Sequence, residues 1–193
     1  MKSLWISLGV VGLIIVLLLF VGGGYVSSKN QMVAKDQNVQ AAFSEIDVNL
    51  QRRADLIPNL VATVKGYANV EESILTAIAN ARAGLMTAKT PDEKLAANDR
   101  LNVALLPLMR MQENYPQLKS NDQFMRLQDE LAGTENRIAV ARRRYNESIR
   151  EYNTFIQQFP NSIWANFAGF HPKNEYYTAD PGAKTAPKVD FSK

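Results

Sequence analysis

The sequence contains no cysteine and only one histidine, His171. Without cysteine, disulfides, thiolate metal sites and cysteine nucleophiles are excluded, and the redox compartment stays open. One histidine falls short of the paired Glu-x-x-His motifs that a di-iron helical bundle requires. The sequence also lacks a P-loop, a Gly-x-Gly-x-x-Gly turn and a Gly-x-Ser-x-Gly elbow. We therefore predict a protein that is not an enzyme and has no catalytic residues, no metal and no cofactor.

Charge is modest and evenly mixed along the chain. The formal net charge is +3, and basic residues alternate with acidic ones. Such a pattern does not indicate a nucleic-acid footprint. The run Arg142-Arg143-Arg144 is interpreted as a solvated or ion-paired helix flank. We expect no nucleic-acid partner, and no small-molecule substrate is indicated.

Residues 3–28 carry no charged side chain, and Leu4 to Val21 form an apolar stretch long enough to cross a hydrocarbon layer of about 30 Å. Trp5 and Tyr25 flank this stretch, as aromatic residues do at membrane interfaces. The pattern predicts an uncleaved single-pass transmembrane helix in residues 1–28. A cleaved signal peptide is the alternative, because Gly22-Gly23-Gly24 offers small residues for cleavage.

The orientation of this anchor stays open. Lys2 and the amino terminus lie on one side, and Lys29 and Lys35 lie on the other. The positive-inside rule cannot separate two positive groups from two. The side of the membrane on which the remaining chain lies is therefore not predicted.

Two long amphipathic helices are predicted, over residues 30–67 and 121–159. The second begins at Ser120-Asn121-Asp122 and ends before Pro160, and its apolar residues follow alternating steps of three and four. Pro58 lies inside the first helix and is expected to bend it without breaking it, because the apolar pattern keeps its phase. The predicted seam of the second helix is Phe124, Leu127, Leu131, Thr134, Ile138, Ala141, Tyr145, Ser148, Tyr152, Phe155 and Phe159.

Two shorter helices are predicted between the long ones. The first starts near Asn69 and ends near Ala88, and the second starts at Thr90-Pro91-Asp92-Glu93, which has the residues of a capping box. Pro107 is expected to kink the second. Short connections make neighbouring helices antiparallel. The predicted fold class is all-α: a transmembrane anchor (1–28), an antiparallel up-and-down four-helix bundle with coiled-coil packing (29–160), and a short aromatic helix with an extended tail (161–193).

Charged residues on the two long helices become complementary when the helices are paired antiparallel. Arg53 falls opposite Asn136 and beside Glu135, and a buried arginine needs such a partner. By the same pairing Glu45 faces Arg144, Asp47 faces Arg142 and Asp55 lies near Thr134. The predicted structural ion-pair layer comprises Glu45, Asp47, Arg53, Asp55, Glu135, Asn136, Arg142 and Arg144.

A short apolar segment follows Pro160. Four of its side chains share one face of a predicted helix, and an apolar face of this size marks an interaction surface when it is exposed. The alternative is that the face caps the end of its own bundle. The candidate membrane or partner contacts are Ile163, Trp164, Phe167 and Phe170.

Several stretches resemble the LemA family, and together with the anchor they cover nearly the whole chain. They include residues 51–61 (QRRADLIPNLV) and 64–67 (VKGY), Tyr115-Pro116 with Leu118-Lys119, and the run from residue 133 to 160. The resemblance implies a single-pass bacterial membrane protein with a four-helix bundle, and it implies no established biochemical activity. Two departures are Val70-Glu71, where the family commonly has His-Glu, and Pro107, where a small or apolar helix former is expected.

We therefore predict a membrane-anchored helical scaffold or adaptor of the bacterial cell envelope. We expect it in the inner (cytoplasmic) membrane, with membrane lipid as one partner, acting as a homo-oligomer or by docking other envelope proteins. The alternative is a sensor or signalling module whose kinked helices transmit a conformational change across the bilayer. That alternative is weakened by the expectation that only three residues precede the span, which leaves no output domain on the far side.

Overall fold

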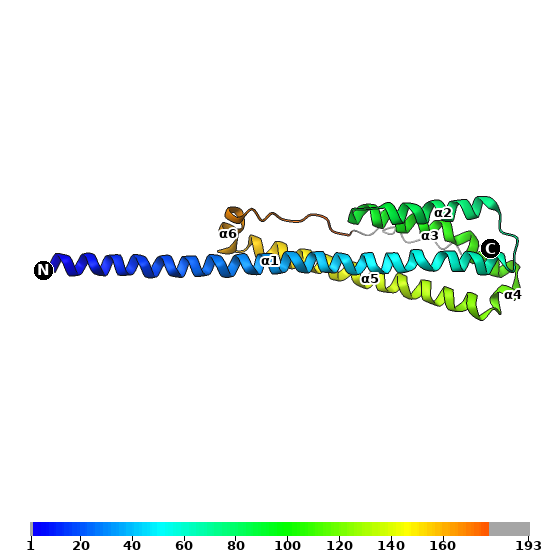
Figure 1. Ribbon diagram of the computed structural model, residues 1–193, viewed down its shortest axis with the longest axis horizontal. Coiled ribbons are helices and arrows are strands. Elements are labelled where there is room, and N and C mark those ends of the chain that lie inside the picture. Colours follow the sequence, from blue (N-terminus) through cyan, green and yellow to red (C-terminus); the bar gives the residue numbers. More distant parts are fainter. Residues whose placement is uncertain (1, 178–193) are drawn as a thin grey trace, which may run out of the picture. The chain divides into compact units, whose positions relative to one another are not determined.

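The computed structural model describes residues 2–177, and every regular element among them is a helix. The all-α prediction is therefore confirmed for this part of the chain, which contains no strand. Figure 1 shows the helices in chain order: α1 (Lys2–Lys65), α2 (Glu72–Thr87), α3 (Pro91–Asn114), α4 (Pro116–Lys119), α5 (Asp122–Gln157) and α6 (Asn161–Ala168).

Helix α1 joins the predicted membrane span and the first predicted long helix into one element. The glycines at positions 22–24 weaken a helix by roughly 0.5–1 kcal/mol each, but no proline follows them until Pro58. The helix also continues through Pro58, with Leu56 and Leu60 helical on either side, as predicted. It ends at Lys65, where the Gly66 amide bonds the carbonyls of the preceding turn, so the predicted end is confirmed.

Helix α3 begins with the predicted capping box. The Thr90 hydroxyl accepts a hydrogen bond from the Glu93 amide (3.2 Å), and the Glu93 carboxylate accepts one from the Thr90 amide (3.2 Å). Helix α2 starts later than predicted. Its N-cap is Glu71, without a side-chain capping bond, whereas the sequence indicated Asn69. At the start of α5, the Asn121 side chain accepts from the Phe124 amide (2.8 Å), and this cap confirms the predicted start.

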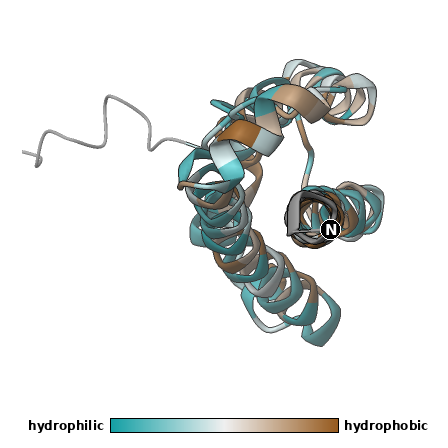
Figure 2. Cartoon of the chain, turned by 90° about the vertical axis from the view of Figure 1, so that its left-hand side faces the viewer, coloured by the Kyte–Doolittle hydropathy of each residue, from teal (hydrophilic) through white to brown (hydrophobic). Residues whose placement is uncertain are grey.

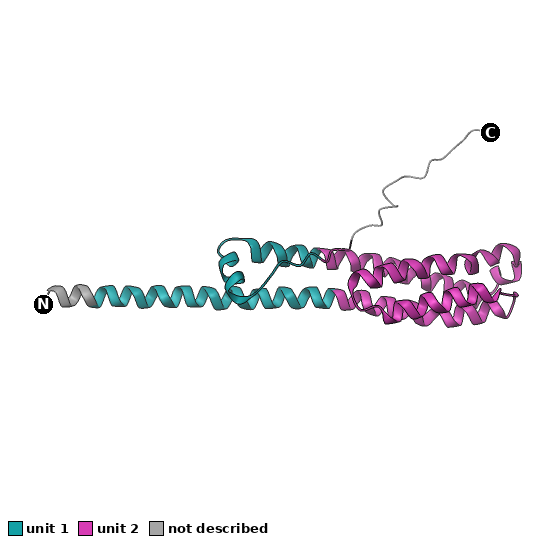
Figure 3. Cartoon of the chain, turned by 90° about the horizontal axis from the view of Figure 1, so that it is seen from above, with its two compact units in different colours: residues 1–42, 147–174 teal, residues 43–146, 175–193 magenta. Residues whose placement is uncertain are grey.

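The described chain divides into two compact units, which are coloured separately in Figure 3. The first unit holds α1 up to Ala42, α5 from Glu147, α6 and the following residues to Asn174. Its buried apolar side chains are Met32, Val39, Ile149, Tyr152, Ile156 and Ala165. Figure 2 shows hydrophilic and hydrophobic residues on the helices of the chain.

The second unit holds the rest of α1, all of α2, α3 and α4, and α5 up to Asn146. Helices α2 and α3 lie side by side within it (Figure 1). Its core is built mainly from aliphatic side chains supplied by each of these helices. Among them are Ile46, Leu50, Ile57, Leu60, Ile78, Leu85, Leu101, Leu105, Leu108, Leu118, Phe124 and Ile138.

Candidate functional site

An aromatic cluster joins α6 to α1 within the first unit. The Tyr25 ring packs edge-on against the Trp164 ring, with centroids 5.6 Å apart, and against the Phe167 ring at 6.0 Å. Next to it, the Ser28 hydroxyl donates to the Asn161 side-chain carbonyl (2.8 Å). Both contacts fix α6 against the part of α1 that directly follows the apolar stretch.

Two of the predicted contact residues on α6 are exposed. Ile163 is 55% exposed and Phe167 is 82% exposed, whereas Trp164 is half-buried against Tyr25. Phe170 lies beyond the helix, because α6 ends at Ala168 and Gly169 adopts a left-handed φ of 77°. The chain turns there, so Phe170 does not share the helical face that the sequence assigned to it.

Arg53 is the centre of the predicted ion-pair layer, and it lies in the second unit. Its side chain is 8% exposed and donates to the Glu135 carboxylate on α5 and to the Asn102 side-chain carbonyl on α3. Burial is the main cause that lowers the pKa of Arg53 to about 10; the nearby charge of Arg142 acts in the same direction, and Asp99 acts in the opposite direction. The guanidinium therefore remains charged at neutral pH, in a site that disfavours charge.

The structure brings together some of the other predicted pairs. Glu45 accepts from Arg144 at 2.8 Å, as the antiparallel pairing of the long helices indicated. Asp47 instead pairs with Lys94 of α3, and Asp55 lies 3.9 Å from Arg82 of α2. Asn136 is exposed on α5. The predicted pairing of Asp47 with Arg142, and of Asp55 with the vicinity of Thr134, is therefore replaced by contacts to α3 and α2.

These differences have a common cause. The predicted pairs involve only the two long helices, but α1 also contacts α2 and α3, which supply basic partners for these acids. Asp55 also accepts from Gln51 one turn earlier (3.0 Å), so a local partner satisfies it. Arg142 lies over the Tyr177 ring, with 5.7 Å between its central guanidinium carbon and the ring centroid.

Two asparagines on α5 hold the segment after α6, and sequence reasoning missed both. In the first unit, the Asn153 amide donates to the Lys173 carbonyl (2.7 Å) and accepts from the Lys173 amide (2.8 Å). In the second unit, Asn146 makes the same pair of bonds with the backbone of Tyr177, both at 2.8 Å. Each asparagine side chain therefore forms two hydrogen bonds with the backbone of a single residue in an extended segment. We call these two contacts the asparagine clamps.

Side-chain contacts accompany each clamp. The Tyr152 hydroxyl donates to the His171 carbonyl (3.1 Å), and the Lys173 ammonium pairs with Asp36 of α1 (2.9 Å). In the second unit, the Tyr177 ring packs edge-on against the Tyr145 ring at 5.3 Å. Burial raises the pKa of Tyr145 to about 12, with Glu175 and Asp92 adding to the shift, and burial also raises the pKa of Tyr177.

A family model of the LemA family matches residues 42–191. The chain belongs to the LemA family. The match covers most of the chain and leaves the apolar first part of α1 outside it. The LemA-like motif residues singled out in the sequence include those that make the contacts just described: Arg53 in the buried layer, and the Tyr-Asn pairs at positions 145–146 and 152–153, which form the clamps.

Three named relatives have similar sequence identities to this LemA family member. The chain is 28% identical over 182 residues to Magnetosome protein MamQ 2 of Paramagnetospirillum magneticum, covering 81% of this chain and 66% of that protein. Identity is 27% over the same length to Magnetosome protein MamQ of Magnetospirillum gryphiswaldense. Identity to Protein LemA of Metamycoplasma hominis is 28% over 146 residues, covering 74% of this chain and 64% of that protein. The chain thus spans slightly less than two thirds of the length of these relatives.

The Tyr-Asn repeat is the sequence feature that would have revealed the clamps in this LemA family member. Tyr145-Asn146 and Tyr152-Asn153 are spaced by seven residues, which is two helical turns, so both asparagines lie on one side of α5. An asparagine next to a buried tyrosine is itself partly buried, so its side-chain amide needs hydrogen-bond partners, and the apolar seam offers none. The predicted seam contains the tyrosine of each pair and not the asparagine.

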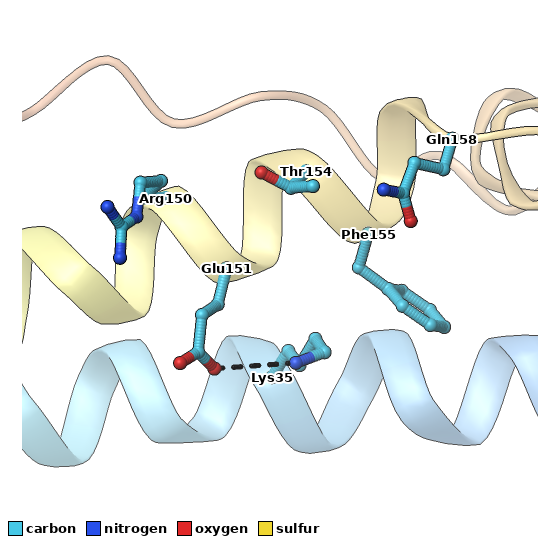
Figure 4. Close-up of a pocket in the computed structure, with 6 residues that line it drawn as sticks. All are labelled: Lys35, Arg150, Glu151, Thr154, Phe155 and Gln158. Atoms are coloured by element: carbon cyan, nitrogen blue, oxygen red, sulfur yellow. Dashed lines mark hydrogen bonds and ion pairs between the residues drawn. The ribbon is translucent and has the colours of Figure 1, made fainter.

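The first unit also contains a shallow pocket between α1 and the end of α5, drawn in Figure 4. Lys35 reaches Glu151 across the two helices (3.5 Å) and lies 5.6 Å from the centre of the Phe155 ring. Among the described residues there is no group of three or more side chains placed to hold a metal ion. The lining residues are Lys35, Arg150, Glu151, Thr154, Phe155 and Gln158.

Proposed function

We propose that this protein is a membrane-anchored helical scaffold or adaptor of the bacterial cell envelope, which acts by protein–protein association. The observation that carries the proposal is the apolar stretch of α1. From Leu8 to Phe20 its large apolar side chains are all at least half exposed, and no part of its most apolar window is buried. An uncovered apolar surface of this length favours a lipid environment, which supports membrane anchoring. The cytoplasmic membrane is the place that we propose for it.

We further propose that the second unit is an antiparallel up-and-down four-helix bundle formed by α1, α2, α3 and α5. Between α1 and α5, Glu45 pairs with Arg144 and Arg53 pairs with Glu135, so the residue numbers run in opposite directions. Between α1 and α3, Asp47 pairs with Lys94 and Arg53 with Asn102, so the numbers rise together. This is the alternation expected for up-and-down connectivity with short loops.

A surface on α2 and α3 supports association with a second copy. A shallow groove lies there; half of its lining residues are alanines, and Val103, which also lines it, is 67% exposed. Small residues allow a second helix to approach closely. Asp99 and Arg100 also line the groove, and adjacent opposite charges are self-complementary across a two-fold axis. The alanines are Ala77, Ala81, Ala96 and Ala104.

The test is the oligomeric state of the full chain in detergent, measured by size-exclusion chromatography with light scattering. The intact protein is expected to form a stable oligomer, and Val103→Lys is expected to dissociate it without lowering the melting temperature. Val48→Lys on α1 is the matched control, because Val48 is 66% exposed and lies outside the groove. A strict monomer before any substitution overturns the scaffold proposal.

One observation favours the second candidate, a module that transmits a conformational change. Helix α1 continues without a break from the proposed span to Lys65, and a rigid helix is a physical route for coupling. A monomeric chain would leave this candidate in place, so the light-scattering measurement separates the two functions.

A further inference from the structure

Helix α6 differs from the other helices of residues 2–177 because it contains no charged residue. Its sequence, NSIWANFA, carries three large apolar side chains in two turns. Phe159, just before it, is 81% exposed, and Phe167 is 82% exposed. Exposed aromatic side chains of this size on an uncharged segment are costly in water.

The position of α6 along α1 indicates what covers this face. Tyr25, which packs against Trp164 and Phe167, follows Val21 at the end of the apolar stretch by four residues, or about 6 Å of helix. The bond from Ser28 to Asn161 holds the start of α6 at the same level (Figure 1). The exposed face is therefore continuous with the surface that we assign to lipid.

We propose that α6 lies in the bilayer interface, at the boundary between headgroups and acyl chains, where α1 leaves the membrane. Phe159, Ile163 and Phe167 enter the lipid, while Trp164 and Tyr25 form the aromatic contact that holds α6 to the anchor. Aromatic residues are enriched at this depth, and short helices with an apolar face lie there in the membrane plane. A bilayer fits this surface better than a protein partner does, because the surface borders the anchor and α6 offers no charge for pairing. The inference rests on the membrane anchoring proposed above.

The test uses the full chain with a single tryptophan as a depth reporter. Trp5→Phe and Trp164→Phe remove both native tryptophans, and Phe167→Trp introduces the reporter. The protein is reconstituted in vesicles of equal parts phosphatidylcholine and phosphatidylglycerol, with or without bromine atoms on the acyl chains near the headgroup. The reporter is expected to emit at short wavelength and to lose most of its emission in the brominated vesicles.

Two further variants in the same background make the result specific. Phe159→Trp is a second reporter, which is expected to be quenched in the same way. Because residue 159 lies before α6, this substitution leaves the sequence of α6 unchanged. Val48→Trp is the matched control, because Val48 is 66% exposed on α1 and follows Tyr25 by 23 residues of the same helix. Its emission is expected to be unaffected by the brominated lipid.

The outcomes are distinct. Long-wavelength emission without quenching from position 167 places the face in water and overturns the inference. Short-wavelength emission without quenching means that a second copy or another protein covers the face, and this also overturns it. If the chain fails to float with the vesicles, the anchoring itself is overturned, and the proposal for α6 is overturned with it.

Discussion

The hydrogen bonds of Arg53 contribute more to the register of the helices than to the stability of the fold. Its guanidinium is nearly excluded from water and is shared between a carboxylate and a side-chain amide from different helices. A buried cation of this kind contributes little net stability, because desolvation offsets the attraction. Its value lies in the register that it imposes, since a shift of either helix would leave the charge without partners.

A double-mutant cycle tests this register. Removing Glu135 leaves the buried guanidinium with Asn102 alone for hydrogen bonding, so we expect Arg53→Met and Glu135→Gln to be coupled by about 1–2 kcal/mol. The control is the adjacent pair of Arg52 and Glu130, which are 3.4 Å apart with side chains about half exposed; coupling there is expected to be below about 0.5 kcal/mol. Urea unfolding of the four proteins in each cycle gives both values, and equal coupling in the two cycles would contradict the assignment.

The raised pKa of Tyr145 leads us to expect a loss of folding stability at alkaline pH. Its pKa is raised from 10.0 to about 12 by burial, so the folded protein keeps the phenol proton after the unfolded chain has lost it. The stability that comes from this difference is present below pH 10 and is lost as the pH rises toward 12. Tyr145→Phe is therefore expected to show a shallower loss of stability than the unsubstituted protein across this range, measured by urea unfolding.

The buried arginine does not obscure this comparison. The lowered pKa of Arg53 makes stability rise with pH above about 10, in the direction opposite to the tyrosine effect. The contribution is the same in both proteins and cancels in their difference. Identical pH profiles for the two proteins would show that Tyr145 does not retain its proton in the folded state.

At the scale of single helices, the apolar seam of α5 was predictable only in part. Every predicted position from Phe124 to Tyr145 is buried, and Tyr152 is buried as well. Beyond Tyr145, however, Ile149 and Ile156 are buried although neither was predicted. Phe159, which follows the end of α5 at Gln157, is 81% exposed. A strict seven-residue repeat drifts by about 20° per heptad on a straight helix. In the last part of α5 the buried side therefore includes Ile149 and Ile156, each one residue beyond a predicted position, and a sequence rule with a fixed step did not include them.

Helix ends were predictable where local chemistry decides them. The capping box at Thr90 and the Asn121 cap are satisfied within one turn, so the sequence contains the whole interaction. The ion pairs to Lys94 and Arg82 depend on which helices become neighbours, and no periodicity records that. The docking of the tail was likewise missed. An extended backbone held by side-chain amides leaves no apolar pattern in its own residues.

The asparagine clamps predict a local change in dynamics. Asn153→Ala removes both hydrogen bonds to the Lys173 backbone, each contributing about 0.5–1.5 kcal/mol. We expect the Lys173 amide to exchange with solvent roughly ten-fold faster, since about 1.4 kcal/mol corresponds to a factor of ten in an opening equilibrium. Hydrogen exchange of full-length protein, read in the peptide containing Lys173, measures this change.

Asn38→Ala is the control for the clamp, because Asn38 is exposed on α1. Exchange at Lys173 should be unchanged in that variant. If Asn153→Ala leaves the exchange rate as it was, the contacts of Tyr152 with the His171 carbonyl and of Lys173 with Asp36 are sufficient to hold the segment, and the clamp is not the element that docks it.

At the scale of the whole molecule, the residues of the proposed anchor and those of the folded core are different sets with different roles. The apolar stretch contributes nothing to the described core, since its window is unburied, and the core contains none of its residues. Substitutions there should change where the protein resides and leave its fold intact. The two properties are therefore separable by mutation, which is the clearest physical consequence of a membrane anchor.

Leu13→Lys combined with Leu17→Lys tests this separation. Both leucines are well exposed in the apolar stretch, and a lysine near the centre of a span costs about 2.5–3.5 kcal/mol. We expect the double variant to leave the carbonate-resistant membrane fraction of expressing cells, while its thermal unfolding, followed by the Trp164 environment, matches that of the intact protein. Val48→Lys adds a lysine at an exposed site outside the stretch, and it should remain in the membrane. Retention of the double variant in that fraction would show that lipid contacts outside α1 hold the protein, whereas a mature chain whose mass lacks the apolar stretch would identify it as a cleaved signal peptide.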